Sequence, residues 1–292
     1  MGWSLLATFT LALFAPFLYR LLGRATGWIL ALFPFTLVVF FAQNLPISPG
    51  ARFIKSWSWV PSLGVDLSFA LDGLSLTFVL LVSGIGGLVL IYSGAYLGEQ
   101  AGGGRFFAYL LLFMGAMLGL VLSDNVITLF VFWELTSISS YLLIGFHHHT
   151  ETSRASALKA LLVTGAGGLL LLAGLLLMML AAAQLGLPFE KAGRISAMFS
   201  LNFHHHPFYL PILVLLLLGA FTKSAQVPFH FWLPAAMAAP TPVSAYLHSA
   251  TMVKAGIYIL ARFHPILGGT LQWETFMIGV GVLTMLVGAI MA

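Results

Sequence analysis

Charged side chains are scarce in this sequence. Asp, Glu, Lys and Arg make up only 7% of its 292 residues, whereas apolar residues make up 60% and the mean hydropathy is +1.04. A soluble globular domain carries about 25% charged residues, so this chain has too little charge to cover a water-facing surface. We therefore expect lipid around most of its perimeter.

Cysteine is absent altogether. Its absence excludes disulfides, thiolate metal sites, iron–sulfur clusters and haem attached through cysteine. The net charge of +4 comes from 12 basic and 8 acidic residues spread along the chain without a basic run. We expect no cofactor, no metal site and no nucleic-acid partner.

Long apolar stretches divide the chain into candidate membrane spans. A membrane helix needs about 20 mostly apolar residues, and eight such stretches are followed here by part of a ninth. The first stretch lacks a basic leader and a small-residue cleavage site, so it is expected to be a retained helix rather than a signal peptide. The expected spans are residues 3–19, 28–42, 71–97, 106–122, 125–146, 157–185, 207–239, 240 to about 262, and 276–292. This pattern predicts an all-α, polytopic transmembrane helix bundle.

The spans suggest four segments. Residues 1–70 hold helices one and two with an extramembrane loop, and 71–123 hold helices three and four. Residues 124–262 hold helices five to eight, and 263–292 begin a ninth helix that we expect to be truncated, since its apolar run stops without an anchoring charge. Residues 44–72 form the longest polar stretch. Alternating segments at 57–59 and 65–69 favour a short hairpin there.

Basic residues do not determine the orientation. With the N-terminus outside, the inside loops hold Arg20, Arg24, Arg105, Arg154 and Lys159, and the outside loops hold Arg52, Lys55, Lys191, Arg194 and Arg262. The two sides carry equal numbers, so the positive-inside rule gives no answer.

Glu134, Lys223 and Lys254 stand near the centres of expected spans. A charge at the bilayer centre costs about 2.5–3.5 kcal/mol by insertion measurements, so each is expected to face a hydrated interior and to find a partner. A buried Glu–Lys bridge that only fixes helix packing is one interpretation. Intramembrane charges more often mark transport paths. Ser137 and Tyr141 follow Glu134 on the same helix face, a polar stripe that can hold water.

Lys223 precedes a predicted helix break. Pro228 has no amide hydrogen and clashes with the carbonyl four residues earlier, at Ser224. The stretch 207–239 is also too long for one straight crossing of a bilayer core of about 30 Å. We therefore expect a discontinuous seventh helix. Broken helices mark ion sites in transporters, and a lysine there can gain and lose a proton.

Further candidates lie on the sixth and eighth spans. His248, Thr251 and Lys254 spread over about 120° of one face at helical spacing, and histidine is a natural proton relay. A structural, hydrogen-bonded histidine is the alternative. Lys159, at the start of the sixth span, either joins the path or marks the membrane interface. The histidine triplets 147–149 and 204–206 are expected to be solvated loops on opposite membrane sides, with metal capture the alternative.

Four motifs resemble the proton-conducting antiporter family. They are Phe-Trp-Glu-Leu-Thr-Ser at 132–137, Lys-Ser-Ala-Gln-Val-Pro at 223–228, Ala-Pro-Thr-Pro-Val-Ser-Ala at 239–245 and His-Ser-Ala-Thr-Met-Val-Lys-Ala-Gly at 248–256. This family comprises the large membrane-arm subunits of complex I and the A and D subunits of Mrp-type multisubunit cation/proton antiporters. The resemblance runs from about residue 71 to residue 292.

The resemblance implies roles for the charged residues. Glu134 and Lys223 match the pair whose making and breaking couples proton movement, and His248 and Lys159 match further positions of the family motifs. Phe-Trp-Glu and Val-Lys-Ala-Gly are closer to the Mrp A-type protein than to the complex I subunit. A second, inverted repeat is expected beyond Ala292.

The implied function is that of a secondary transporter subunit, not an enzyme, in a bacterial inner membrane. Its expected partners are the other subunits of the complex and the lipid bilayer, and the transported ions are protons and Na⁺ or another monovalent cation. The alternative is an antiporter-like proton-pumping subunit of complex I or of a membrane-bound hydrogenase.

Overall fold

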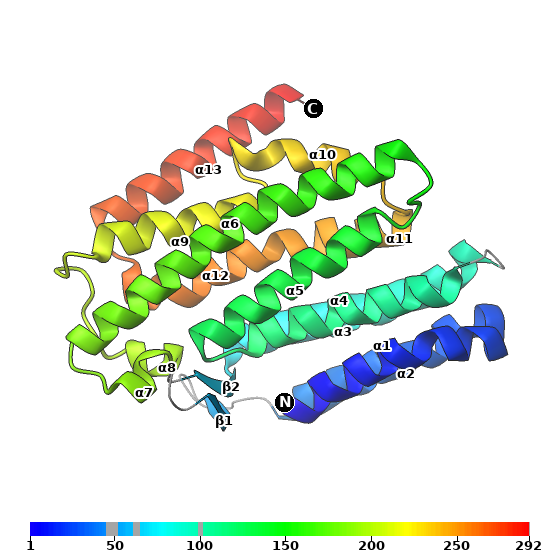
Figure 1. Ribbon diagram of the computed structural model, residues 1–292, viewed down its shortest axis with the longest axis horizontal. Helices are drawn as coiled ribbons and strands as arrows, with labels where there is room; N and C mark the ends of the chain where they lie inside the picture. The colour runs from blue at the N-terminus through cyan, green and yellow to red at the C-terminus, as the bar shows by residue number, and fades with distance from the viewer. Residues whose placement is uncertain (45–51, 61–64, 99–101, 292) are drawn as a thin grey trace.

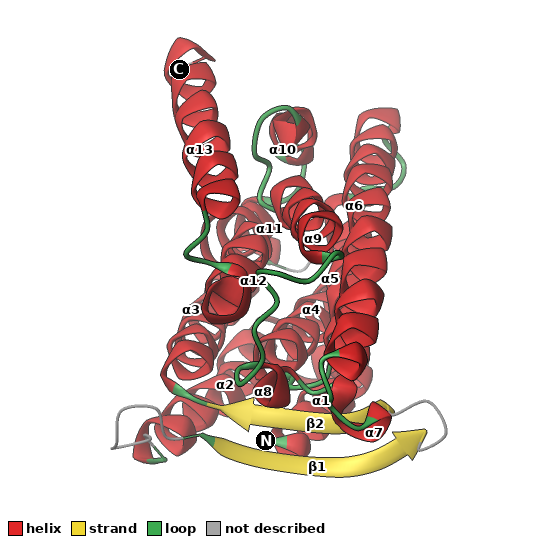
Figure 2. Cartoon of the chain, turned by 90° about the vertical axis from the view of Figure 1, so that its left-hand side faces the viewer, coloured by secondary structure: helices red, strands yellow, loops and turns green. Residues whose placement is uncertain are grey.

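The computed structural model describes residues 1–44, 52–60, 65–98 and 102–291. Long helices lie side by side in a bundle, and a two-stranded sheet closes one end of it (Figures 1 and 2). In chain order the elements are α1 Gly2–Leu22, η1 Gly23–Ala25, α2 Thr26–Gln43, β1 Phe53–Val60, β2 Val65–Leu71, α3 Gly73–Leu97, α4 Gly103–Leu122, α5 Val126–Ile144, α6 Glu151–Gln184, α7 Phe189–Ala192, α8 Ile195–Met198, α9 Tyr209–Lys223, η3 Phe229–Phe231, α10 Trp232–Ala236, α11 Thr241–Ser244, η4 Ala245–Ala250, α12 Met252–Leu267 and α13 Leu271–Met291.

Six helical stretches of the described chain are long and apolar enough to cross a membrane. One of them, Gly2–Gln43, reverses at η1, where Gly23 adopts a φ of 53°. Gly2 lies against Trp57 of β1, so the start of α1 and the strand after α2 meet at the same end of the bundle. Large apolar side chains cover the outer surface, such as Trp3 at 81% and Leu13 at 81% exposed. The prediction of a transmembrane α-helix bundle is confirmed.

The predicted hairpin in the polar stretch is also confirmed. Strands β1 and β2 pair antiparallel from Phe53 opposite Leu71 to Val60 opposite Val65. Strand β2 is buried and β1 is exposed, because β2 lies between β1 and the helix ends. The hairpin therefore covers the helix ends at one end of the bundle.

One aspartate of this hairpin and one of the α4–α5 turn bind the connection between α6 and α9. Asp66 of β2 accepts hydrogen bonds from Arg194 Nε at 2.9 Å and Nη2 at 2.5 Å. Asp124, between α4 and α5, accepts from Ser196 N at 2.9 Å and Ser196 Oγ at 2.7 Å. Burial raises the pKa of Asp124, and the hydrogen bonds from Ser196 oppose that rise. These contacts tie the α6–α9 connection to the α4–α5 turn.

Arg262 corrects a prediction. The sequence pattern places the end of the eighth span near Arg262, in a loop, but α12 continues to Leu267 and Arg262 is buried. Its guanidinium donates two hydrogen bonds to the carboxylate of Asp72, Nη1 to Oδ2 at 2.5 Å and Nη2 to Oδ1 at 3.0 Å. Its Nε donates to Tyr258 Oη at 3.0 Å. Buried arginine is tolerated here because each of its three nitrogens donates a hydrogen bond and its charge faces a carboxylate.

Asp72 has a second role as the N-cap of α3. Its side chain accepts from the Ser75 amide, and Ser75 Oγ accepts from the Asp72 amide, which forms a reciprocal capping box. Burial alone would raise the pKa of Asp72, but the hydrogen bonds and charge of Arg262, with the bonds from Ser75, hold it at about 2. Asp72 thus fixes the start of α3 to the end of α12.

The discontinuous seventh helix is confirmed. Helix α9 ends at Lys223, and the chain resumes as η3 and α10. The Thr222 carbonyl accepts a hydrogen bond from Trp232 Nε1 at 2.9 Å, and the Val227 amide donates to Thr284 Oγ1 of α13 at 3.1 Å. Backbone groups freed at membrane depth are thus satisfied by protein side chains.

The eighth span begins at the Pro240–Pro242 segment as predicted, but it is not one regular helix. It consists of α11, the π-helical turn η4 and α12, with a break at Thr251, where φ is −133° and ψ is −71°. Helix α6 begins at Glu151, six residues before the predicted start, and α13 begins at Leu271 rather than at 276. Lys159 therefore lies two turns inside α6, not at its start.

Candidate functional site

Lys223 is fully buried where α9 breaks. Its Nζ donates to the Trp133 carbonyl at 2.7 Å and to Ser137 Oγ at 2.8 Å, both on α5. The ammonium also lies 4.5 Å from the centroid of the Trp133 ring, in cation–π range. Of the polar face predicted on α5, only Ser137 contacts Lys223, whereas Tyr141 is exposed on the surface of the bundle.

Glu134 stands between the two α5 groups that hold Lys223. Its Oε1 is buried and has no hydrogen-bond partner among the described residues. The ion pairs of the described chain do not include one between Glu134 and Lys223 within 4.0 Å. The direct contact that the resemblance implies is therefore not formed in this arrangement, although the two charges lie close enough to interact electrostatically.

Two glycines of α6 make room for this site. A Cβ on Gly168 would overlap Oε1 of Glu134, and a Cβ on Gly167 would overlap Oγ1 of Thr222. The same added carbon on Gly168 would lie 3.0 Å from Glu134 Cδ and 3.3 Å from Trp133 Cδ1. The Glu134 carboxylate therefore occupies space that exists only because α6 has no side chain at this position.

His248 lies in the π-helical turn η4 and is buried. Neither ring nitrogen makes a hydrogen bond of ordinary geometry within the described residues, although the Ala236 backbone is near. Its ring centroid is 6.1 Å from that of Trp232 in α10. His248 therefore faces the second half of the broken helix.

The expected face of His248, Thr251 and Lys254 is not one continuous row. The Thr251 hydroxyl donates to the Tyr246 carbonyl at 2.6 Å, and Thr251 itself interrupts the helix. A spacing of 100° per residue does not hold across a π-helical turn and a helix break, so the three residues do not share the helix face that the spacing predicts. Lys254 is half-buried in α12.

Lys159 is exposed on α6 and is not brought to the Lys223 site. The α5–α6 turn with the first histidine triplet and the connection before α9 with the second lie at opposite ends of the bundle, as expected (Figure 1). Within the described ranges, no group of three or more His, Asp or Glu side chains could hold a metal ion.

Sequence reasoning misses two contributors. Trp133 is fully buried, and its carbonyl and its ring both hold Lys223, a role that an apolar side chain in a span does not suggest. Gly168 is the second, because it has no side chain of its own and yet leaves the room that the Glu134 carboxylate fills. The sequence does carry one signal for the role of Gly168. Several glycines cluster in the middle of the α6 span, and α6 packs against α5, the helix that carries Glu134.

Two known protein families match parts of this chain. Residues 123–292 match the family described as NADH:quinone oxidoreductase/Mrp antiporter, TM, and residues 57–107 match NADH-ubiquinone oxidoreductase (complex I), chain 5 N-terminus. The first match covers more than half of the chain. The chain belongs to the NADH:quinone oxidoreductase/Mrp antiporter transmembrane family, and it is a multi-pass protein of the bacterial cell membrane.

Individual relatives agree with this family. The chain is 48% identical to the A subunit of the Na⁺/H⁺ antiporter of Alkalihalophilus pseudofirmus, over 98% of this chain and 35% of that protein. It is 45% identical to the A1 subunit of the Na⁺/H⁺ antiporter of Staphylococcus haemolyticus, over 94% of this chain and 34% of that protein. A chain of the Mrp complex from Dietzia sp. superposes with a TM-score of 0.89 at 39% identity, covering 99% of this chain and 31% of that chain. The chain thus spans about a third of the length of these relatives.

Proposed function

We propose that this chain forms a proton-conducting part of the A subunit of an Mrp-type multisubunit Na⁺/H⁺ antiporter. It would act as a secondary transporter component, together with the other subunits of the complex. The names of the relatives, the shared fold and the four sequence motifs support this proposal.

One observation carries the proposal: a fully buried lysine at a helix break, held by α5 on either side of Glu134. A charge at membrane depth costs several kcal/mol and persists where it has a function. The buried amine of Lys223 and the carboxyl group of Glu134 lie near one another inside the bundle. Their interaction changes whenever either gains or loses a proton.

In this proposal Lys223 alternates between two positions. In the first, which the structure contains, Nζ is bound by the Trp133 carbonyl and Ser137 Oγ. In the second, Nζ moves to the unpartnered Oε1 of Glu134 and forms the ion pair. A proton or cation that approaches Glu134 shifts the balance between these positions, since it competes with the ammonium for the same carboxylate.

Water would connect this pair to the other candidates. Trp133 Nε1, Glu134 Oε1, His230 Nδ1 and both ring nitrogens of His248 are buried without partners in the described chain. Buried polar atoms of this kind normally bind ordered water. We propose that His248 relays protons from the Lys223 site across the break at Pro228, and that Lys254 and Lys159 extend the path.

The test uses everted vesicles that contain the complete native complex and an imposed proton gradient. Addition of Na⁺ should dissipate the gradient with electron flow blocked. Lys223→Ala should abolish this exchange at normal assembly, whereas Lys191→Ala, the same change on an exposed lysine, should not. Proton movement seen only during redox turnover would instead support the pumping subunit of a complex I-like enzyme.

A further inference from the structure

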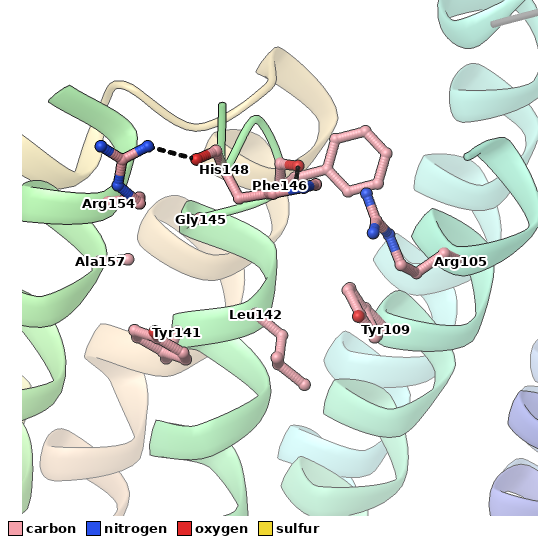
Figure 3. A pocket seen from close by; sticks show the side chains of 9 residues that line it. All are labelled: Arg105, Tyr109, Tyr141, Leu142, Gly145, Phe146, His148, Arg154 and Ala157. Atoms are coloured by element: carbon pink, nitrogen blue, oxygen red, sulfur yellow. Dashed lines mark hydrogen bonds between the residues drawn. The ribbon is translucent and has the colours of Figure 1, made fainter. Parts of the chain in front are cut away.

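A cavity of about 250 Å³ lies at the end of the bundle opposite the β1–β2 hairpin. The beginnings of α4 and α6 and the end of α5 surround it. Figure 3 shows Arg105 on α4 and Arg154 on α6 on either side of the α5 terminus, with Phe146 and His148 between them and Tyr109 and Tyr141 deeper along the helices.

Uncharged groups hold both arginines in place, so their positive charges are not neutralised. The Arg105 guanidinium lies 5.3 Å from the centroid of the Phe146 ring. Arg154 Nη1 donates to the carbonyls of His148 at 2.7 Å and His149 at 3.3 Å. No carboxylate lies within 4.0 Å of either guanidinium in the described ranges, and no acidic residue lines the cavity. Two fixed positive charges therefore border one hollow.

The surroundings have the polarity of a membrane interface. The cavity lies at helix ends, where lipid headgroups are found, and tyrosine is typical of that depth. Tyr141 is 37% exposed, and one turn further into the membrane Ile138 is 49% exposed on the same helix. A charged hollow thus continues into an apolar strip of α5. Free phosphate would use the hollow alone, whereas a phospholipid would use both.

We propose that this cavity binds the phosphate headgroup of an anionic phospholipid, with its acyl chains along α5. A guanidinium presents a planar fork of donors that matches phosphate oxygens, and basic pockets between transmembrane helices bind anionic headgroups. An adjacent cavity of about 500 Å³ shares Arg105 and Phe146 and is lined by His147 and His149, which gives room for a glycerol or second phosphate group. Binding of a lipid here requires no step of the transport mechanism.

The experiment measures lipid binding to the complete purified complex by native mass spectrometry. The complex is delipidated and titrated with phosphatidylglycerol or with phosphatidylcholine. Each arginine near an anionic headgroup contributes about fivefold to affinity, so the double variant Arg105→Gln/Arg154→Gln should bind phosphatidylglycerol about thirtyfold more weakly. Arg20→Gln is the control, since Arg20 is also an exposed arginine at the end of a helix on this face but does not line the cavity. Arg105→Lys/Arg154→Lys keeps the charge and should recover only part of the affinity.

Each result is decisive. Strong, saturable binding of phosphatidylglycerol that the double variant loses and Arg20→Gln keeps supports the site. Equal loss in Arg20→Gln would show general surface electrostatics and overturn it. Displacement of the lipid by millimolar inorganic phosphate would assign the hollow to free anions. No preference for phosphatidylglycerol over phosphatidylcholine in the unaltered complex would also refute the proposal.

Discussion

Gly168→Ala should disable transport without unfolding the chain. An alanine Cβ at this position would overlap Oε1 of Glu134 and lie 3.0 Å from Glu134 Cδ and 3.3 Å from Trp133 Cδ1. The carboxylate is the end of a flexible side chain, so it can move away at a small cost. Overpacking costs about 1–3 kcal/mol, and the gain in helix propensity from Gly to Ala, about 1 kcal/mol, offsets part of it. Folding and assembly should therefore survive.

The effect on function should be much larger. The Glu134 carboxylate would have to leave the pocket beside Gly168, and a displacement of about 1 Å can cost about 100-fold where geometry matters. We expect Na⁺-driven dissipation of the proton gradient to fall at least about tenfold. Gly165→Ala is the matched control, because a Cβ at Gly165 meets no atom within 4 Å. It should keep full activity.

A second substitution separates steric displacement from general damage. Glu134→Asp shortens the side chain by one methylene and should weaken exchange by itself, yet restore part of the activity in the Gly168→Ala background. The assay is the initial rate of exchange in everted vesicles, normalised to the amount of assembled complex. Full exchange by Gly168→Ala, or an equal loss in Gly165→Ala, would show that the pocket beside Gly168 does not position Glu134 for transport.

Three further predictions concern residues that hold the bundle together or carry the site. Asp72→Asn should lower the free energy of unfolding by about 3 kcal/mol, because it leaves the buried Arg262 unpaired. The pKa of Asp72 in the folded chain, about 2, is below its unfolded value of about 3.9, so this stabilisation is complete above about pH 4 and is lost as pH falls toward 2; melting curves of the two proteins should converge on acidification. Arg194→Gln should cost under about 1 kcal/mol, since the Arg194 side chain is 31% exposed, and a loss as large as that of Asp72→Asn would contradict this ranking. His248→Gln should slow exchange without changing the melting temperature by more than a few degrees, because no described residue bonds to its ring; a large loss of stability would instead indicate a structural histidine.

Most of the architecture could be predicted from the sequence. Low charge and long apolar runs require a membrane, since no other solvent accommodates such a surface. Pro228 behind Lys223 predicted the helix break, because a residue without an amide hydrogen cannot continue the ladder. Alternation around Trp57 predicted the hairpin. The central charged residues stood out because charge is costly at membrane depth.

Tertiary structure decided which residues meet. The sequence could not show that Lys223 binds the Trp133 carbonyl and Ser137 instead of Glu134, since that choice depends on how α9 is placed against α5. It could not show that Arg262 forms an ion pair with Asp72, 190 residues away along the chain, because hydropathy reports the polarity of a residue and not its partner. The room that Gly168 leaves for a carboxylate exists only once α6 packs against α5.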